Sequence, residues 1–229
     1  MTTRFLRYST AAIAAAAILT AGKVAAAQGV RPSPEPTTTV LPNPAGMAKA
    51  KSDSLRYPYT AADIEFMTGM IGHHAQAIIM AGWVPSHGAN ASIGRLAERI
   101  INAQQDEIVT MQTWLRDRRQ PVPDGHTAGM LMVMDGVEHV MLMPGMLTET
   151  QMKELDQARG TEFDRLFLTF MMQHHRGAVS MVKQLFESYG AGQDETVFKF
   201  ASDVNVDQTT EIARMEKMLG ALLPDGRAP

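Results

Sequence analysis

The sequence contains no cysteine among its 229 residues. This absence excludes disulfide bonds, zinc–thiolate sites and thiol nucleophiles. Basic charge is not in excess either, because 21 Lys and Arg residues stand against 24 Asp and Glu residues for a formal net charge of −3. A nucleic-acid binder needs a basic surface, so the sequence predicts no nucleic-acid partner.

Recognised catalytic motifs are also missing. The sequence has no glycine-rich phosphate loop, no nucleophile elbow and no acidic calcium loop. Di-iron bundles carry Glu-x-x-His, but no glutamate stands three positions before any of the seven histidines. Aromatic residues are few, with 8 Phe, 4 Tyr and 2 Trp, whereas there are 18 methionines. This excess of thioethers is the feature that a function has to explain.

The N-terminus has the features of a secretion signal. Arg4 and Arg7 precede a short apolar run from Ala11 to Ala21, and Ala25–Ala27 offer a small-residue cleavage site. A membrane span needs about 20 apolar residues, so the run is too short to be one. We expect residues 1–27 to be a signal peptide and the mature protein to be periplasmic or secreted, with no membrane span left. An uncleaved N-terminal anchor is the alternative.

The remaining chain divides into a linker, one domain and a tail. Residues 28–58 hold half of the 12 prolines and predict an extended or disordered linker. Apolar residues then recur at helical spacing in four long stretches and one short stretch. They predict helices at about 60–82, 92–118, 148–158, 161–189 and 194–222. The Met-rich stretch 123–145 is predicted to be irregular, and residues 223–229 form the tail.

An internal repeat organises this domain of residues 59–222. Asp63–Met80 aligns with Asp164–Met181 at one constant offset, and Gln104–Leu115 aligns with Gln208–Leu219. Two copies of a helix pair predict an all-α fold, a four-helix bundle with pseudo-twofold symmetry. Residues 59–118 are the first repeat, 119–160 the Met-rich connection and 161–222 the second repeat. The first acidic residue of each copy is expected to have a helix-dipole or a capping role at the N-terminus of its helix.

Two His-His pairs occupy matching positions of the two repeats. Each pair follows a methionine by three to four residues, and a second methionine follows about two turns later on the same helix. Thioether with imidazole is a soft donor set that selects copper, above all Cu(I). The predicted ligands are therefore Met70, His73, His74, Met80, Met171, His174, His175 and Met181. The alternative is that these side chains only fill or hydrogen-bond the core.

Two further groups of residues are candidates for the same chemistry. Glu107 and Glu211 occupy matching positions on the second helices of the repeats. They are expected either to point inward, as ligands or as acceptors for a histidine N–H, or to be solvated or salt-bridged. The connection places six methionines between Met130 and Met146, as a flexible soft-metal segment or as an apolar flap. The candidates in this connection are Met143, Met146, His126 and His139.

Three stretches carry a resemblance to a known family. At FMTGMIGHHAQAI, MPGMLT and FDRLFLTFMMQHHRGAVSM the chain resembles the family catalogued as domain of unknown function 305, over about Tyr59 to Leu222. The resemblance implies a ferritin-like four-helix bundle and an exported protein that binds copper through Met and His. By motif it carries over Met70, His73, His74, Met171, His174, His175, Met143 and Met146.

These observations predict an exported copper-binding protein that sequesters, buffers or transfers the metal without turnover. A copper-transfer protein or a second copy of the chain is its expected protein partner. One alternative is a ferritin-like metal-dependent oxidase that uses Glu107, Glu211 and the histidines. The other is a metal-free helical bundle whose His-His pairs serve stability or protein interaction.

Overall fold

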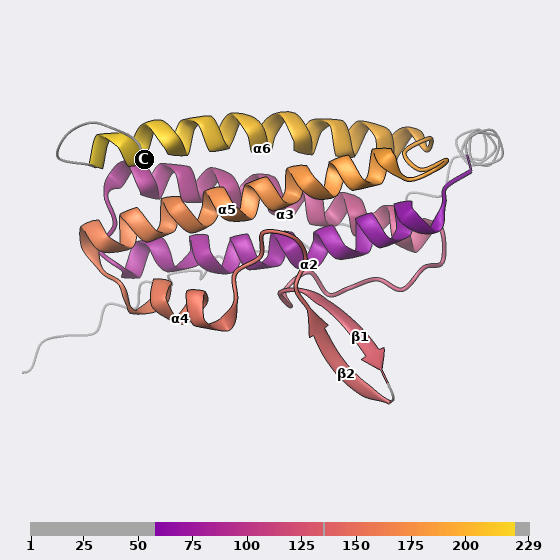
Figure 1. Cartoon of the computed structure of the whole chain (residues 1–229), viewed down its shortest axis with the longest axis horizontal. Helices are drawn as coiled ribbons and strands as arrows, with labels where there is room; N and C mark the ends of the chain where they lie inside the picture. Colours follow the sequence, from indigo (N-terminus) through magenta and orange to yellow (C-terminus); the bar gives the residue numbers. More distant parts are fainter. Residues whose placement is uncertain (1–57, 135, 223–229) are drawn as a thin grey trace, which may run out of the picture. The chain divides into compact units, whose positions relative to one another are not determined.

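The computed structural model describes residues 58–134 and 136–222. The predicted signal peptide, the linker before Pro58 and the tail after Leu222 lie outside the described residues. Four long helices dominate the described part (Figure 1), and their ends fall within two residues of the prediction. They are α2 (Ala61–Trp83), α3 (Ala91–Asp117), α5 (Gly160–Glu187) and α6 (Glu195–Leu222). A 3-10 turn (Val84–Ser86) follows α2, and α4 (Glu149–Gln157) precedes α5.

The helices begin where polar side chains accept the first free backbone N–H groups. Thr60 and Asp63 form a reciprocal capping box at the start of α2, and Thr148 and Gln151 form another at α4. Asn90 accepts the N–H of Ser92 at the start of α3. The local sequence therefore supplies a capping side chain at each of these three starts.

The prediction of an irregular connection was wrong for its central part. Residues Met130–Met134 (β1) and Val137–Met141 (β2) form a two-stranded antiparallel hairpin, with Met130 paired to Met141. The sequence signal is the Asp-Gly dipeptide at positions 135–136, which favours a tight hairpin turn, and Gly136 has the positive φ of 78° that such a turn requires. Figure 1 shows this hairpin standing off the helices near α2.

The helices pack as the two predicted pairs. α2 packs on α3, α5 packs on α6, and the two pairs meet where α2 contacts α5. α4 and β1 also contact α2, which is buried along most of its length. The all-α bundle built from repeated helix pairs is thus confirmed, while its ferritin-like assignment stays a prediction. In the described part of the chain, no helix combines the length and apolarity that a membrane span requires.

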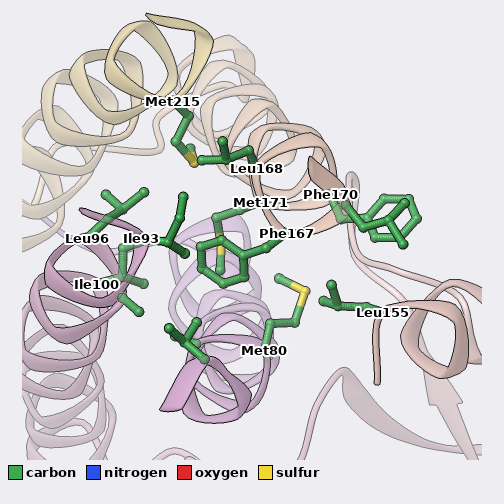
Figure 2. Packing of buried hydrophobic residues seen from close by; sticks show 14 of the residues in the cluster. Met80, Ile93, Leu96, Ile100, Leu155, Phe167, Leu168, Phe170, Met171 and Met215 are labelled. Carbon is green, nitrogen blue, oxygen red and sulfur yellow. The ribbon is translucent and has the colours of Figure 1, made fainter. Parts of the chain in front are cut away.

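The core consists of two apolar clusters with a polar layer between them. Figure 2 shows the first cluster, which contains Phe167 and Leu96; the second contains Phe66 and Leu115. Each long helix contributes to both clusters, and buried polar side chains occupy the stretch between its two contributions. These polar residues are His73, His74, Gln76, Gln104, His174, His175 and Gln208, and we call the set the polar layer. Buried polar groups are costly, so a continuous layer of them points to a use other than packing.

Asp63 and Asp164, the first acidic residues of the two aligned repeats, hydrogen-bond across the interface between the repeats. Asp63 caps its own helix as predicted, and its Oδ1 also accepts the N–H of Gly192 at 2.7 Å. Asp164 does not cap its own helix; it accepts the N–H of Asn90 at 3.1–3.2 Å. Burial raises the pKa of the Asp164 carboxyl. Each aspartate therefore holds the interhelical loop of the other repeat, a tertiary contact that spacing alone could not reveal.

We expect Asp63→Asn to lower the free energy of unfolding by about 1–2 kcal/mol, because the single amide oxygen cannot accept both the Gly192 N–H and the Thr60 N–H, as the two carboxylate oxygens do. Urea unfolding followed by circular dichroism measures the change. The control is Asp203→Asn in the exposed pair Lys199–Asp203, which should stay within about 0.5 kcal/mol of wild type. Equal stability of the two variants would show that neither the contact with Gly192 nor the capping box with Thr60 depends on the carboxylate.

Candidate metal centre

The four histidines of the two pairs come together in the polar layer. His73 and His74 from α2 and His174 and His175 from α5 are each 0% exposed. The rings of His73 and His174 face each other across the interface between repeats, with centroids 3.8 Å apart. Within each pair the centroids are 6.2 Å apart. His73 and His174 are therefore the inner pair, and His74 and His175 are the outer pair.

The outer histidines contact carboxylates of the second helices. His74 Nε2 lies 2.6 Å from Glu107 Oε2, and His175 Nε2 lies 2.7 Å from Glu211 Oε2. An ionised carboxylate only accepts, so each Nε2–H donates and, in the neutral ring, Nδ1 keeps a lone pair. Both carboxylates are about one fifth exposed. Glu107 and Glu211 thus accept a histidine N–H, which was one of the predicted alternatives. In metal sites, such carboxylates orient the imidazole ligands.

The inner histidines have few hydrogen-bond partners. His73 Nε2 donates to the carbonyl of Pro144 at 3.1 Å, and its Nδ1 has no partner. His174 has no hydrogen-bond partner on either ring nitrogen. A buried polar group without a partner costs about 1–3 kcal/mol. The inner pair thus carries a cost that a bound ion would offset.

Electrostatics keep the inner histidines neutral. Burial, aided by the neighbouring His74, lowers the pKa of His73 to about 3. Burial and then the adjacent His73 lower the pKa of His174 well below its ordinary value. Neutral imidazole is the form that binds metals. At neutral pH both rings therefore offer lone pairs without first releasing a proton.

The predicted methionine ligands flank the polar layer on both sides. Met80 and Met171 belong to the first apolar cluster, and Figure 2 shows them reaching toward the ring of Phe167. Met70 and Met181 belong to the second cluster. Every first helix thus places one thioether before its histidines and one after them, in different clusters. Whether these four sulfurs bind a metal stays a prediction.

The MPGM segment of the connection (Met143–Met146) lies against α2 and α5, the first helices of the two repeats. Its approach to α5 requires glycine at position 177, because a Cβ there would lie 1.9 Å from the Pro144 oxygen. The residues just before β1 approach α2 as closely, since a Cβ on Gly72 would lie 2.0 Å from the Gly129 oxygen. Met146 is buried, and its Sδ lies 3.2 Å from the Met143 nitrogen. The segment that carries Met143 and Met146 is therefore seated next to the polar layer.

Glutamine side chains hold the same segment, and sequence reasoning missed them. Gln76 donates to the Leu147 carbonyl at 3.0 Å and accepts the Leu147 N–H at 2.7 Å. Gln173 donates to the Gly145 carbonyl at 3.2 Å. A signal was present in the repeat alignment, where Gln76 stands opposite Gly177 and Gly72 opposite Gln173. These mismatches lie where the connection packs on the two first helices. Gly129 lies against Gly72 of α2, and Pro144 and Gly145 lie against Gly177 of α5.

Gln104 and Gln208 are also parts of the layer that were not predicted as site residues. Both are buried, and in both an amide oxygen has no hydrogen-bond partner. They align with each other in the repeat, three residues before Glu107 and Glu211. His126 and His139, by contrast, are exposed and lie outside the polar layer.

Carboxylates and imidazoles alone do not complete a metal site. Within residues 58–134 and 136–222, no group of three or more His, Cys, Asp or Glu side chains is arranged to hold a metal ion. The inner pair supplies two imidazoles, so further donors would have to be of another type. Thioethers are the donors that this sequence has in excess.

Comparison with known proteins identifies relatives of this fold. Residues 63–219 match the model of the family Domain of unknown function (DUF305). A DUF305 protein of Streptomyces coelicolor, whose name proposes that it is secreted, is 26% identical with a TM-score of 0.58, over 70% of this chain and 93% of that chain. The protein L153 of Acanthamoeba polyphaga mimivirus, described as uncharacterized, is 39% identical over 57 residues. That match spans 25% of this chain and 38% of L153.

A structural relative has been solved with metals bound. The structure of CopM in its Cu(I)-bound form is 27% identical to this chain, covers 68% of it and 94% of CopM, and has a TM-score of 0.52. CopM has also been solved in a Cu(II)-bound form, which has a TM-score of 0.53 and the same identity. A related protein with this fold therefore binds copper in both oxidation states.

Proposed function

The chain belongs to the DUF305 family, and from that premise we propose that it is an exported copper-binding protein. Its role is to sequester, buffer or transfer copper through Met and His side chains, without turnover. The single observation that carries the proposal is the inner pair, His73 and His174. These two rings are fully buried, come from different repeats, and have three ring nitrogens without hydrogen-bond partners.

The donor set fits a soft ion. Neutral imidazoles and thioethers need no deprotonation, and together they favour Cu(I) over Ca²⁺ or Mg²⁺. Met70, Met80, Met171 and Met181 lie in the clusters on either side of the layer, while Glu107 and Glu211 orient the outer histidines. When bound, copper would supply the missing partner for the inner nitrogens. CopM, which binds Cu(I), Cu(II) and Ag, supports this assignment.

Export is supported by two observations. Residues 1–27 have the composition of a signal peptide. The Streptomyces coelicolor relative carries a name that proposes secretion. An exported protein meets an oxidising compartment, where methionine, unlike cysteine, binds copper without forming disulfides.

The test is a titration of the protein with Cu(I) or Ag(I) against a chelator, followed by native mass spectrometry. Wild type should bind discrete, chelator-resistant equivalents. The double variant His73→Gln and His174→Gln should bind at least one equivalent fewer, with unchanged helical circular dichroism. The matched control, His126→Gln with His139→Gln, removes two exposed imidazoles and should bind as wild type does.

Two results would contradict the proposal. Only a weak, continuous ladder of adducts in wild type would leave the layer as a structural feature of a metal-free bundle. Consumption of dioxygen at substoichiometric protein, with Cu(I) or Fe(II) as electron donor, would instead establish the metal-dependent oxidase.

A further inference from the structure

A second group of methionines meets outside the polar layer. A cleft of about 660 Å³ opens between the base of the hairpin, the beginning of α2 and the end of α5. Four of the residues that line it are methionines from three different parts of the chain, namely Met130, Met141, Met143 and Met181. Met141 is 41% exposed, so solvent reaches the cleft at this side chain, whereas Met181 is buried at its inner end.

The hairpin register brings two of these side chains together. Met130 on β1 is the direct partner of Met141 on β2. Directly paired residues project on the same face of a hairpin, with Cβ atoms about 5 Å apart. The two flexible thioethers can therefore reach one ion between them without any change of backbone.

A glycine brings the other two together. A Cβ on Gly69 would lie 2.9 Å from Met143 Sδ and 3.6 Å from Met181 Cε, so both thioethers occupy the space above this residue. The repeat places Phe170 at the position equivalent to Gly69. The first repeat thus has no side chain at Gly69, where Met143 and Met181 meet, whereas the second repeat has a phenylalanine at the equivalent position.

The charge of the cleft favours a cation. Glu65 is the charged residue among those that line it, and no Lys or Arg belongs to the described lining. Pro144 also lines the cleft, and its carbonyl is the acceptor for His73 Nε2. The cleft therefore adjoins the polar layer through the MPGM segment.

We propose that this cleft is a separate, solvent-accessible site for a soft monovalent cation, Cu(I) or Ag(I), held by the thioethers of Met130, Met141, Met143 and Met181. Four neutral sulfur donors beside one carboxylate suit such an ion and disfavour hard cations. The inference rests on the proposed function, since it assigns the same metal. It differs in placing an ion outside the histidine layer, at the point where an ion from solvent first meets the MPGM segment.

The test uses silver, because Ag(I) does not change its oxidation state during the titration. The protein is labelled with ¹³C at the methionine methyl groups and titrated with Ag(I) against a chelator. The variant Met130→Leu with Met141→Leu keeps the apolar volume and removes two sulfurs. We expect it to bind one Ag(I) fewer than wild type in native mass spectrometry. The silver-induced shifts of the Met143 and Met181 methyl signals should shrink in the same variant.

Two controls separate the outcomes. Met152→Leu with Met218→Leu removes two methionines that pack against the first cluster, and it should bind as many ions as wild type. The double variant His73→Gln and His174→Gln should keep the Ag(I) ion bound in the cleft and lose an ion bound elsewhere. If wild type binds silver but the hairpin variant binds equally many ions with the same methyl shifts, the cleft site is refuted alone. If wild type binds none, the proposed function is refuted with it.

Discussion

Lowering the pH from 7 to 5 is expected to reduce the free energy of unfolding of the metal-free protein by about 2 kcal/mol through His73, and further through His174. Both rings are fully buried, and burial lowers the pKa of His73 to about 3 and that of His174 well below its ordinary value. In the unfolded chain both titrate near pH 6.5. Below that pH the unfolded state binds two protons that the folded state does not.

The sign and the window follow from these shifts. Stability is fully present above about pH 6.5 and falls as the pH drops toward 3, by about 1.4 kcal/mol per pH unit and histidine. The exposed carboxyls with lowered pKa, such as Glu149 and Glu162, lose their contribution only near their own lower range. The interval from pH 7 to 5 therefore lies above the range in which these exposed carboxyls lose their contribution.

Urea unfolding at pH 7, 6 and 5, with a chelator present, measures the slope. His174→Gln should reduce the slope by about half, whatever its effect on stability at pH 7, because one proton fewer is taken up. His126→Gln changes an exposed ring and should leave the slope unchanged. A stability that is flat across this interval in wild type would mean that the folded layer accepts protons as readily as the unfolded chain does.

The repeat allowed much of the centre to be predicted. The alignment marks His73 and His174 as equivalent positions of the two first helices. Because the equivalent residues Met70 and Met171 lie in different clusters, α2 and α5 run antiparallel, and only equivalent positions near the middle of both helices, such as His73 and His174, lie side by side. The helices themselves follow from capping residues and helical spacing. Glu107 and Glu211 were predicted as acceptors for histidine only as one of several alternatives, since helical spacing does not decide which face of α3 or α6 turns inward.

The rest depends on tertiary contacts that no local pattern carries. The hydrogen bond that the Asn90 N–H donates to Asp164 joins different repeats, so the expectation that Asp164 caps its own helix was wrong. The seat of the MPGM segment depends on Gly177 and on two glutamines, Gln76 and Gln173, which are unremarkable in any single helix. Only the repeat alignment, in which a glutamine of one repeat stands opposite a glycine of the other, marks the place where the connection packs on the helices. His126 was grouped with the soft-metal segment by proximity in sequence, whereas the structure leaves it exposed and outside the layer.

Replacement of Gly177 by alanine is expected to lower the free energy of unfolding by up to about 3 kcal/mol. In an open helix, the same change stabilises by about 1 kcal/mol. Here the new Cβ would lie 1.9 Å from the Pro144 oxygen, 2.5 Å from the Pro144 carbonyl carbon and 2.6 Å from the Gly145 Cα. All three are backbone atoms, so no side-chain rotation relieves the overlap and the MPGM segment has to move away from α5.

The displaced segment should lose the hydrogen bonds that seat it. These include the bond from Gln173 to the Gly145 carbonyl, at 3.2 Å, and the bond from His73 to the Pro144 carbonyl, at 3.1 Å. Hydrogen exchange of the Leu147 N–H, which Gln76 accepts, reports directly on the seat of the segment. We expect this amide to exchange faster in Gly177→Ala, while amides in the middle of α3 and α6 change only in proportion to global stability.

Gly94→Ala is the matched control, because Gly94 also lies inside a helix and a Cβ there would meet nothing within 4 Å. It should stabilise the protein by about 0.5–1 kcal/mol and leave the exchange of Leu147 unchanged. Gly72→Ala should also lower the free energy of unfolding, since its Cβ would lie 2.0 Å from the Gly129 oxygen, but it displaces the residues before β1 and not the MPGM segment. If Gly177→Ala were as stable as Gly94→Ala, with Leu147 equally protected, the close crossing of the MPGM segment over α5 would be wrong. The carbonyl of Pro144 would then be lost as the partner of His73.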